Sequence, residues 1–85
     1  MVWDVEVDCA GLLCPLPVLR ARKRLISMQP GQVLALLATD KMAAIDLPHF
    51  CAEAGHGFLG AQDLGAQDLG AQEAGGTTRY LIRRG

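Results

Sequence analysis

Apolar and polar residues alternate at the start of the chain. Trp3, Val5 and Val7 fall on one side of an extended segment, and acidic residues fall between them on the other side. This period of two is typical of a strand with one buried face. We therefore predict a β-strand over residues 2 to 7.

The apolar residues that follow recur at helical spacing, and basic residues occupy the opposite face. The apolar stripe consists of Val18, Leu19, Ala21, Leu25 and Ile26. Such a stripe indicates a helix with one buried face, which we place from Pro15 to about Met28. Pro30 and Gly31 then end it, because proline cannot continue a helix and glycine suits the turn.

Residues 32 to 38 form an apolar run, in which every residue after Gln32 is apolar. Such a run is typical of a central strand that is covered well and lies parallel to its neighbour. Together with the first strand and the helix, it predicts a right-handed βαβ unit.

A second helix is expected near residues 47 to 54. Thr39 or Asp40 can cap the segment that leads into it, and Gly55 ends it. Cys51 falls on the apolar face of this helix, so we interpret it as a core residue.

Two further strands are expected, one beginning at Phe58 and one over about residues 77 to 84, with a tandem repeat between them. The pentapeptide Gly-Ala-Gln-Asp-Leu occurs twice over residues 60 to 69, and a degenerate third copy extends the repeat to residue 74. A period of five suits neither a strand nor a helix, and three units are too few to stack a solenoid core. We interpret residues 60 to 74 as an insertion in a surface loop and expect it to be mobile and dispensable.

Length and composition predict one small domain over residues 1 to 85. The formal net charge of −1 argues against non-specific binding to nucleic acid as the main activity. The three cysteines are an odd count, which favours free thiols in a reducing compartment over a disulfide framework. Because the sequence also lacks a signal peptide and a run of membrane-spanning length, we expect a cytoplasmic protein with no membrane partner.

The candidate reactive atom is the sulfur of Cys14, where the first strand leads into the first helix. Gly11 lets the backbone turn, and Pro15 and Pro17 are tolerated only in the first turn of a helix. Cys14 is therefore predicted to be the N-cap, with the Cys14 and Leu16 amides free beside the sulfur. The positive end of a helix lowers the pKa of a thiol and raises its thiolate fraction. The alternative is an inert, small apolar residue at the cap.

Four basic residues lie in the first helix, at Arg20, Arg22, Lys23 and Arg24. One interpretation is an ordinary solvated helix face. The other is a docking surface that attracts an acidic partner, or RNA carried by a partner, toward Cys14.

The residues from Asp8 to Pro17 form the pattern Asp-x-x-Gly-x-x-Cys-Pro-x-Pro, with Asp8, Gly11, Leu12, Cys14, Pro15 and Pro17 as its matching positions. In this pattern the chain resembles the TusA-like, or SirA-like, family of small sulfur-carrier proteins. The resemblance continues through Arg22-Lys23, Met28-Gln29-Pro30-Gly31, residues 46 to 51 and residues 79 to 85. It covers nearly the whole chain except residues 60 to 74.

This resemblance implies both a fold and a function. The fold is an α+β two-layer sandwich with element order β-α-β-α-β-β, in which a mixed four-stranded sheet has both helices on one face. The function is that of a sulfurtransferase-type carrier: Cys14 accepts a sulfane sulfur as a persulfide from a donor, typically a cysteine desulfurase. A downstream acceptor protein then receives the sulfur, as in tRNA thiolation. Whether the protein is an enzyme in its own right stays open.

Supporting roles follow from the same signature. Asp8 is expected to shape the turn by bonding nearby amides, and the alternative is that it tunes the thiol. Gly11, Pro15, Leu16 and Pro17 are the other supporting residues. Arg22 and Lys23 match basic family positions and are candidates for partner binding.

Three alternatives are weighed against the carrier function. A second thiol at Cys9, where the family commonly has another residue, could resolve a persulfide into a Cys9–Cys14 disulfide and make a redox protein. A metal module could draw on the three cysteines, His49 and His56, but the close Cys-x-x-Cys spacing of structural zinc sites is missing from the sequence. A nucleic-acid-binding module is disfavoured by the net charge and the few aromatic residues. We expect no cofactor, no resident metal and no direct binding of nucleic acid.

Overall fold

The computed structural model describes residues 2–65 and 76–85. Its elements, in chain order, are β1 Val5–Cys9, α1 Leu16–Ile26, β2 Val33–Ala38, α2 Ala43–Ala54, β3 Gly57–Gly65 and β4 Thr77–Arg83. The order β-α-β-α-β-β is the one expected from the sequence.

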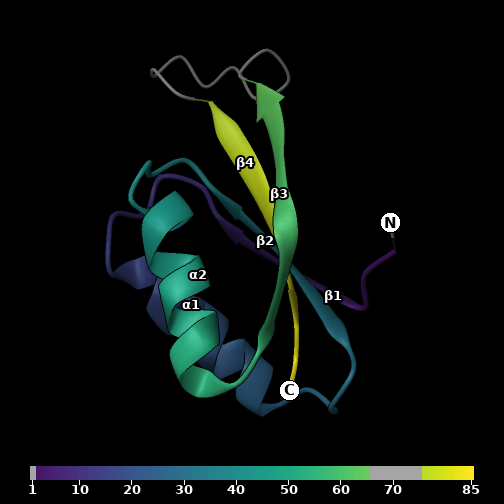
Figure 1. Cartoon of the computed structure of the whole chain (residues 1–85). Coiled ribbons are helices and arrows are strands. Elements are labelled where there is room, and N and C mark those ends of the chain that lie inside the picture. The colour runs from purple at the N-terminus through teal and green to yellow at the C-terminus, as the bar shows by residue number, and fades with distance from the viewer. Residues whose placement is uncertain (1, 66–75) are drawn as a thin grey trace.

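The four strands form one mixed sheet in the order β1-β2-β4-β3. β1 and β2 are parallel, while β4 is antiparallel to both β2 and β3. Both helices cover one face of this sheet, so the chain forms two layers (Figure 1). The predicted α+β sandwich is therefore confirmed.

The core lies between the sheet and the two helices, and aliphatic side chains dominate it. Its fully buried members include Leu34 and Leu36 from β2, Leu25 from α1, Leu47 from α2 and Ile82 from β4. Alternation explains the choice on each strand, because every second side chain of a strand points to the same face. In the described residues, no helix is long and apolar enough to cross a membrane.

The apolar stripe of α1 is narrower than the sequence predicts. Ala21 and Leu25 are buried, whereas Leu19 and Ile26 are 51% and 70% exposed. Pro17 is buried as well and continues the spacing of four toward the start of the helix. Pro17, Ala21 and Leu25 thus form the buried side of α1, and Val18 packs against the core beside them as predicted. Leu19 and Ile26 are left on the surface.

Trp3 also differs from the prediction, because its side chain does not make the same kind of contact as Val5 and Val7. Those two valines pack against the core, while the ring of Trp3 lies 4.4 Å from the guanidinium carbon of Arg79 in a cation–π contact. The chain bends at Asp4, whose carboxylate accepts a 2.8 Å hydrogen bond from the Val33 N–H. The regular alternation therefore begins only at Val5.

α2 begins one turn earlier than predicted, at Ala43 rather than Leu47. A start at Leu47 would put Pro48 in the first turn, where proline is favoured, but Pro48 lies inside the helix. The earlier turn is closed by a 2.8 Å hydrogen bond from the Asp46 N–H to the Met42 carbonyl. At the other end, Gly55 adopts the left-handed conformation, with φ +83°, and ends the helix as predicted.

The first unit of the pentapeptide repeat is part of the sheet. β3 continues through Gly65, and Ala61, Gln62 and Asp63 pair with residues of β4. The expectation that the whole repeat is loop is therefore wrong for residues 60 to 65. The β-bulges next to Gly60 and Gly65 show how the strand accommodates the five-residue period. The rest of the predicted insertion, residues 66 to 74, lies outside the described residues.

Candidate functional site

The connection after β1 is a tight turn held by hydrogen bonds to its backbone. Asp8 Oδ1 accepts a 2.9 Å bond from the Ala10 N–H, which is the kind of contact that the sequence predicted for this side chain. The N–H of Gly11 donates to Thr39 Oγ1 at 2.9 Å, and Gly11 has φ +85°. A side chain is strained at such a φ, so glycine is required for this turn. The turn is thereby tied to the end of β2.

Cys14 follows this turn and is exposed, whereas the other two cysteines are buried. It does not cap α1 as predicted. The helix begins at Leu16, its N-cap is Pro15, and the Leu19 N–H bonds to the Pro15 carbonyl at 3.1 Å. The helix thus starts one residue later than the two prolines suggested.

The two amides expected to be free beside the sulfur are both occupied. The N–H of Cys14 donates to Asp40 Oδ2 at 2.6 Å, and the N–H of Leu16 donates to the Leu13 carbonyl at 2.8 Å. Because these donors are already bonded, they do not offer a thiolate the stabilisation that the sequence analysis assigned to the helix end.

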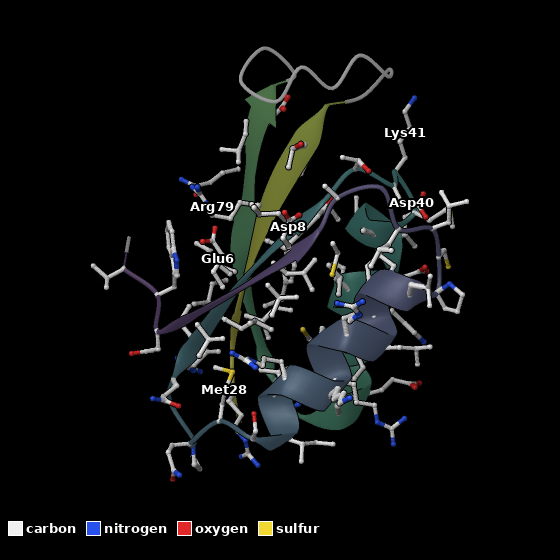
Figure 2. The ribbon with its side chains drawn as sticks, turned by 180° about the vertical axis from the view of Figure 1, so that it is seen from behind. Glu6, Asp8, Met28, Asp40, Lys41 and Arg79 are labelled. Atoms are coloured by element: carbon white, nitrogen blue, oxygen red, sulfur yellow. The ribbon has the colours of Figure 1, made fainter. Side chains whose placement is uncertain are left out.

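Two carboxylates hold Cys14 instead. The thiol donates to Asp46 Oδ2 at 2.8 Å, and Asp40 accepts from the Cys14 amide. Asp40 follows β2, and Asp46 lies in the first turn of α2. Figure 2 shows Asp40 at the end of the molecule where the helices begin, and Met28 toward the opposite end.

The two nearby carboxylates favour the protonated form of the Cys14 sulfur. The hydrogen bond to Asp46 is the largest cause that raises the pKa of the Cys14 thiol, followed by desolvation and by the negative charges of Asp46 and Asp40. A raised pKa means that the neutral thiol persists to higher pH than usual. The prediction of a lowered pKa is therefore wrong, because nearby carboxylates replace the free helix amides as the dominant influence.

The two segments that carry this site also carry four exposed apolar side chains. Leu13 and Leu16 flank Cys14 in the sequence, and Met42 and Ile45 come from the segment that carries Asp46. Their exposed fractions are 68%, 44%, 45% and 63%, in that order. We call these four residues the apolar rim. Large apolar side chains this exposed around one polar group are typical of a surface that another molecule covers.

The basic residues of α1 separate into two groups. Arg20, Lys23 and Arg24 line one surface pocket of about 460 Å³, together with Val7 of β1. Arg22 lines a different pocket, of about 430 Å³, with residues of α2. The predicted patch of Arg20, Lys23 and Arg24 is therefore one continuous surface, but Arg22 does not belong to it.

Cys9 and Cys51 are core residues. Burial is the largest cause that raises the pKa of the Cys9 thiol, and it raises the pKa of Cys51 to about 11. A buried, neutral thiol is inert, so Cys51 has the structural role predicted for it. The burial of Cys9 argues against its proposed role in resolving a Cys14 persulfide.

The histidines occupy separate surroundings. His49 is exposed, with its ring Nε2 3.6 Å from a carboxylate oxygen of Glu53. His56 accepts a 3.0 Å hydrogen bond from the Gly85 N–H through Nδ1. Burial, followed by the charge of Arg84, lowers the pKa of the His56 ring. Among residues 2–65 and 76–85, no group of three metal-ligating side chains comes together.

Asp40 and Asp46 were not predicted from the sequence as parts of the site. A signal for Asp40 was available, because the carboxyl ends of two parallel strands lie at the same edge of a sheet. Cys14 follows β1 and Asp40 follows β2, so the βαβ prediction already placed them close together. Asp46 was harder to find, because its position depends on the early start of α2.

Comparison with known proteins identifies related chains. The family model described as sulfurtransferase TusA matches residues 5–84. The sulfur carrier protein TusA of Allochromatium vinosum is 37% identical over 82 residues, which cover 96% of this chain and 95% of that protein. A Neisseria meningitidis protein with a sulfur-carrier name is 51% identical over 57 residues, or 67% of this chain and 77% of its own length.

A solved structure supports the fold. The crystal structure of a SirA-like protein from Desulfitobacterium hafniense matches with a TM-score of 0.68 and 22% identity. The match covers 96% of this chain and 99% of the other. At this identity the likeness shows a shared fold.

Proposed function

The chain belongs to the TusA family of sulfurtransferases, and on that basis we propose that it is a sulfur carrier that holds a sulfane sulfur as a persulfide on Cys14. The observation that carries this proposal is the exposure of Cys14, since Cys9 and Cys51 are both buried. Only an exposed sulfur can be reached by a sulfur atom that another protein presents.

The transfer is an exchange at sulfur. Cys14 Sγ attacks the terminal sulfur of the donor persulfide, a new S–S bond forms, and the S–S bond of the donor breaks. The donor leaves as a thiol, and Cys14 becomes a persulfide. Delivery to an acceptor thiol repeats the same exchange in the other direction, so no net oxidation or reduction occurs.

The partners of this exchange are proteins. We propose a cysteine desulfurase, or another persulfide donor, on one side and a sulfur-relay protein on the other, as in tRNA thiolation in the cytoplasm. Support comes from the apolar rim around Cys14 and from the basic surface of Arg20, Lys23 and Arg24. The rim offers area that a partner can bury, and the basic surface attracts acidic partners at a distance.

Asp8, Gly11 and the two prolines of the signature determine the backbone conformation around Cys14. Asp8 and Gly11 fix the turn that precedes Cys14, and Pro17 is buried in the first turn of α1. Their role in this proposal is to hold an exposed sulfur on a rigid support.

The proposal is tested by following sulfane sulfur. The protein is incubated with cysteine, pyridoxal phosphate and a cysteine desulfurase, separated from them, and treated with cyanide, which converts sulfane sulfur to thiocyanate. We expect close to one equivalent of thiocyanate from the wild type and from Cys51→Ser, and none from Cys14→Ser. Equal yields from Cys14→Ser and the wild type would exclude Cys14 as the carrier atom.

A further inference from the structure

The proton on Cys14 presents a chemical problem for the proposed transfer. The thiol donates this proton to Asp46 Oδ2 across 2.8 Å. Thiolates are the nucleophiles in exchange at sulfur, and a neutral thiol reacts slowly unless its proton is removed during the attack. Sulfur transfer through this site therefore requires a group that accepts the thiol proton during the attack.

The ionisable groups that act on the thiol are both acidic. Asp46 comes from α2, and Asp40 comes from the connection between β2 and α2. Asp40 is already engaged, because its two carboxylate oxygens accept from the N–H groups of Cys14 and Met42 at 2.6 and 3.1 Å. Asp46 is the carboxylate that contacts the sulfur itself, so it is the group placed to take the proton.

We propose that Asp46 is a catalytic residue that removes the proton from Cys14 as the sulfur attacks the donor persulfide. This inference rests on the proposed function and adds to it a second residue with a defined role.

The step balances without any further reactant. As the bond between Cys14 Sγ and the terminal donor sulfur forms, the thiol proton moves to the Asp46 carboxylate. The S–S bond of the donor breaks, and its electron pair remains on the departing sulfur. Asp46 then returns the proton to that thiolate, so that a thiol and a persulfide give a persulfide and a thiol.

The energetics favour a proton transfer that accompanies the attack over one that precedes it. The free thiol holds its proton firmly, since the carboxylates raise its pKa. A sulfur that has begun to bond to a second sulfur is a much stronger acid, and a carboxylate at hydrogen-bond distance can then accept the proton. General-base assistance of this kind typically contributes about 10²–10⁴-fold to a rate.

A simpler role for Asp46 makes a different prediction. If the carboxylate only keeps the thiol neutral, then its removal should accelerate every reaction of Cys14, because more thiolate would form. If Asp46 also acts as the base, its removal should slow sulfur transfer even though more thiolate is present. The two roles therefore separate when two reactions of the same sulfur are compared.

The test uses Asp46→Asn, which keeps the size of the side chain and removes the charge. Cys14 is alkylated with iodoacetamide and, separately, loaded with cysteine persulfide, both small enough that protein docking plays no part. The matched control is Glu53→Gln, the same chemical change on an exposed residue near the other end of α2. Asp46→Glu retains a carboxylate, so it should load faster than Asp46→Asn.

We expect Asp46→Asn to react with iodoacetamide several-fold faster than the wild type at about pH 7 and to accept sulfur at least about tenfold more slowly. The ratio of wild-type to variant loading rates should be largest at low pH and should shrink as the pH rises and thiolate becomes abundant. Ionisation of the donor cancels in this ratio, and Glu53→Gln should match the wild type in both reactions.

Loading of Asp46→Asn at the wild-type rate or faster would overturn the role of Asp46 and leave the carrier function intact. Failure of the wild type itself to accept sulfur on Cys14 would overturn the proposed function, and this inference with it.

Discussion

Cys14 combines two properties that are usually separate. Its sulfur is exposed, yet the bond to Asp46 holds it as a neutral thiol. An exposed thiolate would be oxidised and would exchange with any disulfide or persulfide that it met. The acidic setting therefore suits a carrier that must meet many small thiols and react with few proteins.

The protonation of Cys14 predicts its pH dependence. The carboxylates raise the pKa of this thiol, so the neutral form persists and thiolate appears only at higher pH. We expect alkylation by iodoacetamide under native conditions to occur at Cys14 and to rise with pH along a curve displaced to higher pH than that of a short cysteine peptide with blocked, uncharged ends. A curve displaced to lower pH would show that the helix end dominates after all.

Asp40 supports the site through its contacts with the backbone. It accepts hydrogen bonds from the N–H groups of Cys14 and Met42 and so joins the two segments that meet at the sulfur. Asp40→Ala should lower the free energy of unfolding by about 1–2 kcal/mol, because two donors lose their partner. Urea denaturation measures this loss, with the exposed neighbour variant Lys41→Ala as the control. A loss equal to that of the control would mean that water replaces both bonds without cost.

At the scale of elements, the site is built where three of them end or begin. The turn after β1 carries Cys14, the connection after β2 carries Asp40, and the first turn of α2 carries Asp46. Because β1 and β2 are parallel, their carboxyl ends share one edge of the sheet. The apolar rim comes from the same segments, which is why we propose that a partner docks on them.

The apolar rim should matter for a protein donor and not for a small one. Leu13→Gln and Ile45→Gln replace two exposed rim side chains and should each slow loading by a cysteine desulfurase about five- to thirtyfold, the effect of losing roughly 1–2 kcal/mol of binding. Loading by cysteine persulfide should stay unchanged. Ile26→Gln, at the other end of α1, is the control. If it slowed desulfurase loading as much as the rim variants do, the rim would have no special role.

Local sequence patterns predicted which helices and strands form better than they predicted the residues at which these elements begin and end. The unbroken apolar run gave β2 almost to the residue, because every position of a covered central strand can be apolar. The start of α2 was misplaced, because the segment that leads to Leu47 is itself the first turn of the helix. The start of α1 lies one residue later than predicted, because two prolines separated by one residue fit the first turn in more than one way.

At the scale of the whole molecule, the sequence singled out Cys14, which is exposed in the structure, but it predicted the wrong direction for the pKa shift of its thiol. Cys14 could be chosen from neighbouring residues alone, since Gly11, Pro15 and Pro17 surround it in the chain. Its pKa depends on Asp46, which is 32 positions away and approaches only when α2 packs beside α1. Local signals describe a helix end well, but they carry no information on a carboxylate that the fold brings to it.

The pentapeptide repeat leads to a prediction about the stability of the whole molecule. Deleting residues 65 to 69 yields the same chain as deleting residues 60 to 64, because the two copies are identical. The remaining copy can supply all the residues that β3 uses, so we expect the free energy of unfolding to change by less than about 0.5 kcal/mol. Urea denaturation and loading with cysteine persulfide check this result. A loss of about 2 kcal/mol or more would show that the second copy supports the fold.

The most direct test of the account is the intact mass of the protein after incubation with cysteine, pyridoxal phosphate and a cysteine desulfurase. Wild type, Cys14→Ser, Cys9→Ser and Cys51→Ser are compared before and after reduction. We predict the gain of one sulfur atom, removed by reduction, in every form except Cys14→Ser. A gain that survives in Cys14→Ser, or that disappears in Cys9→Ser while Cys9→Ser remains folded, would contradict the claim that Cys14 alone carries the sulfur.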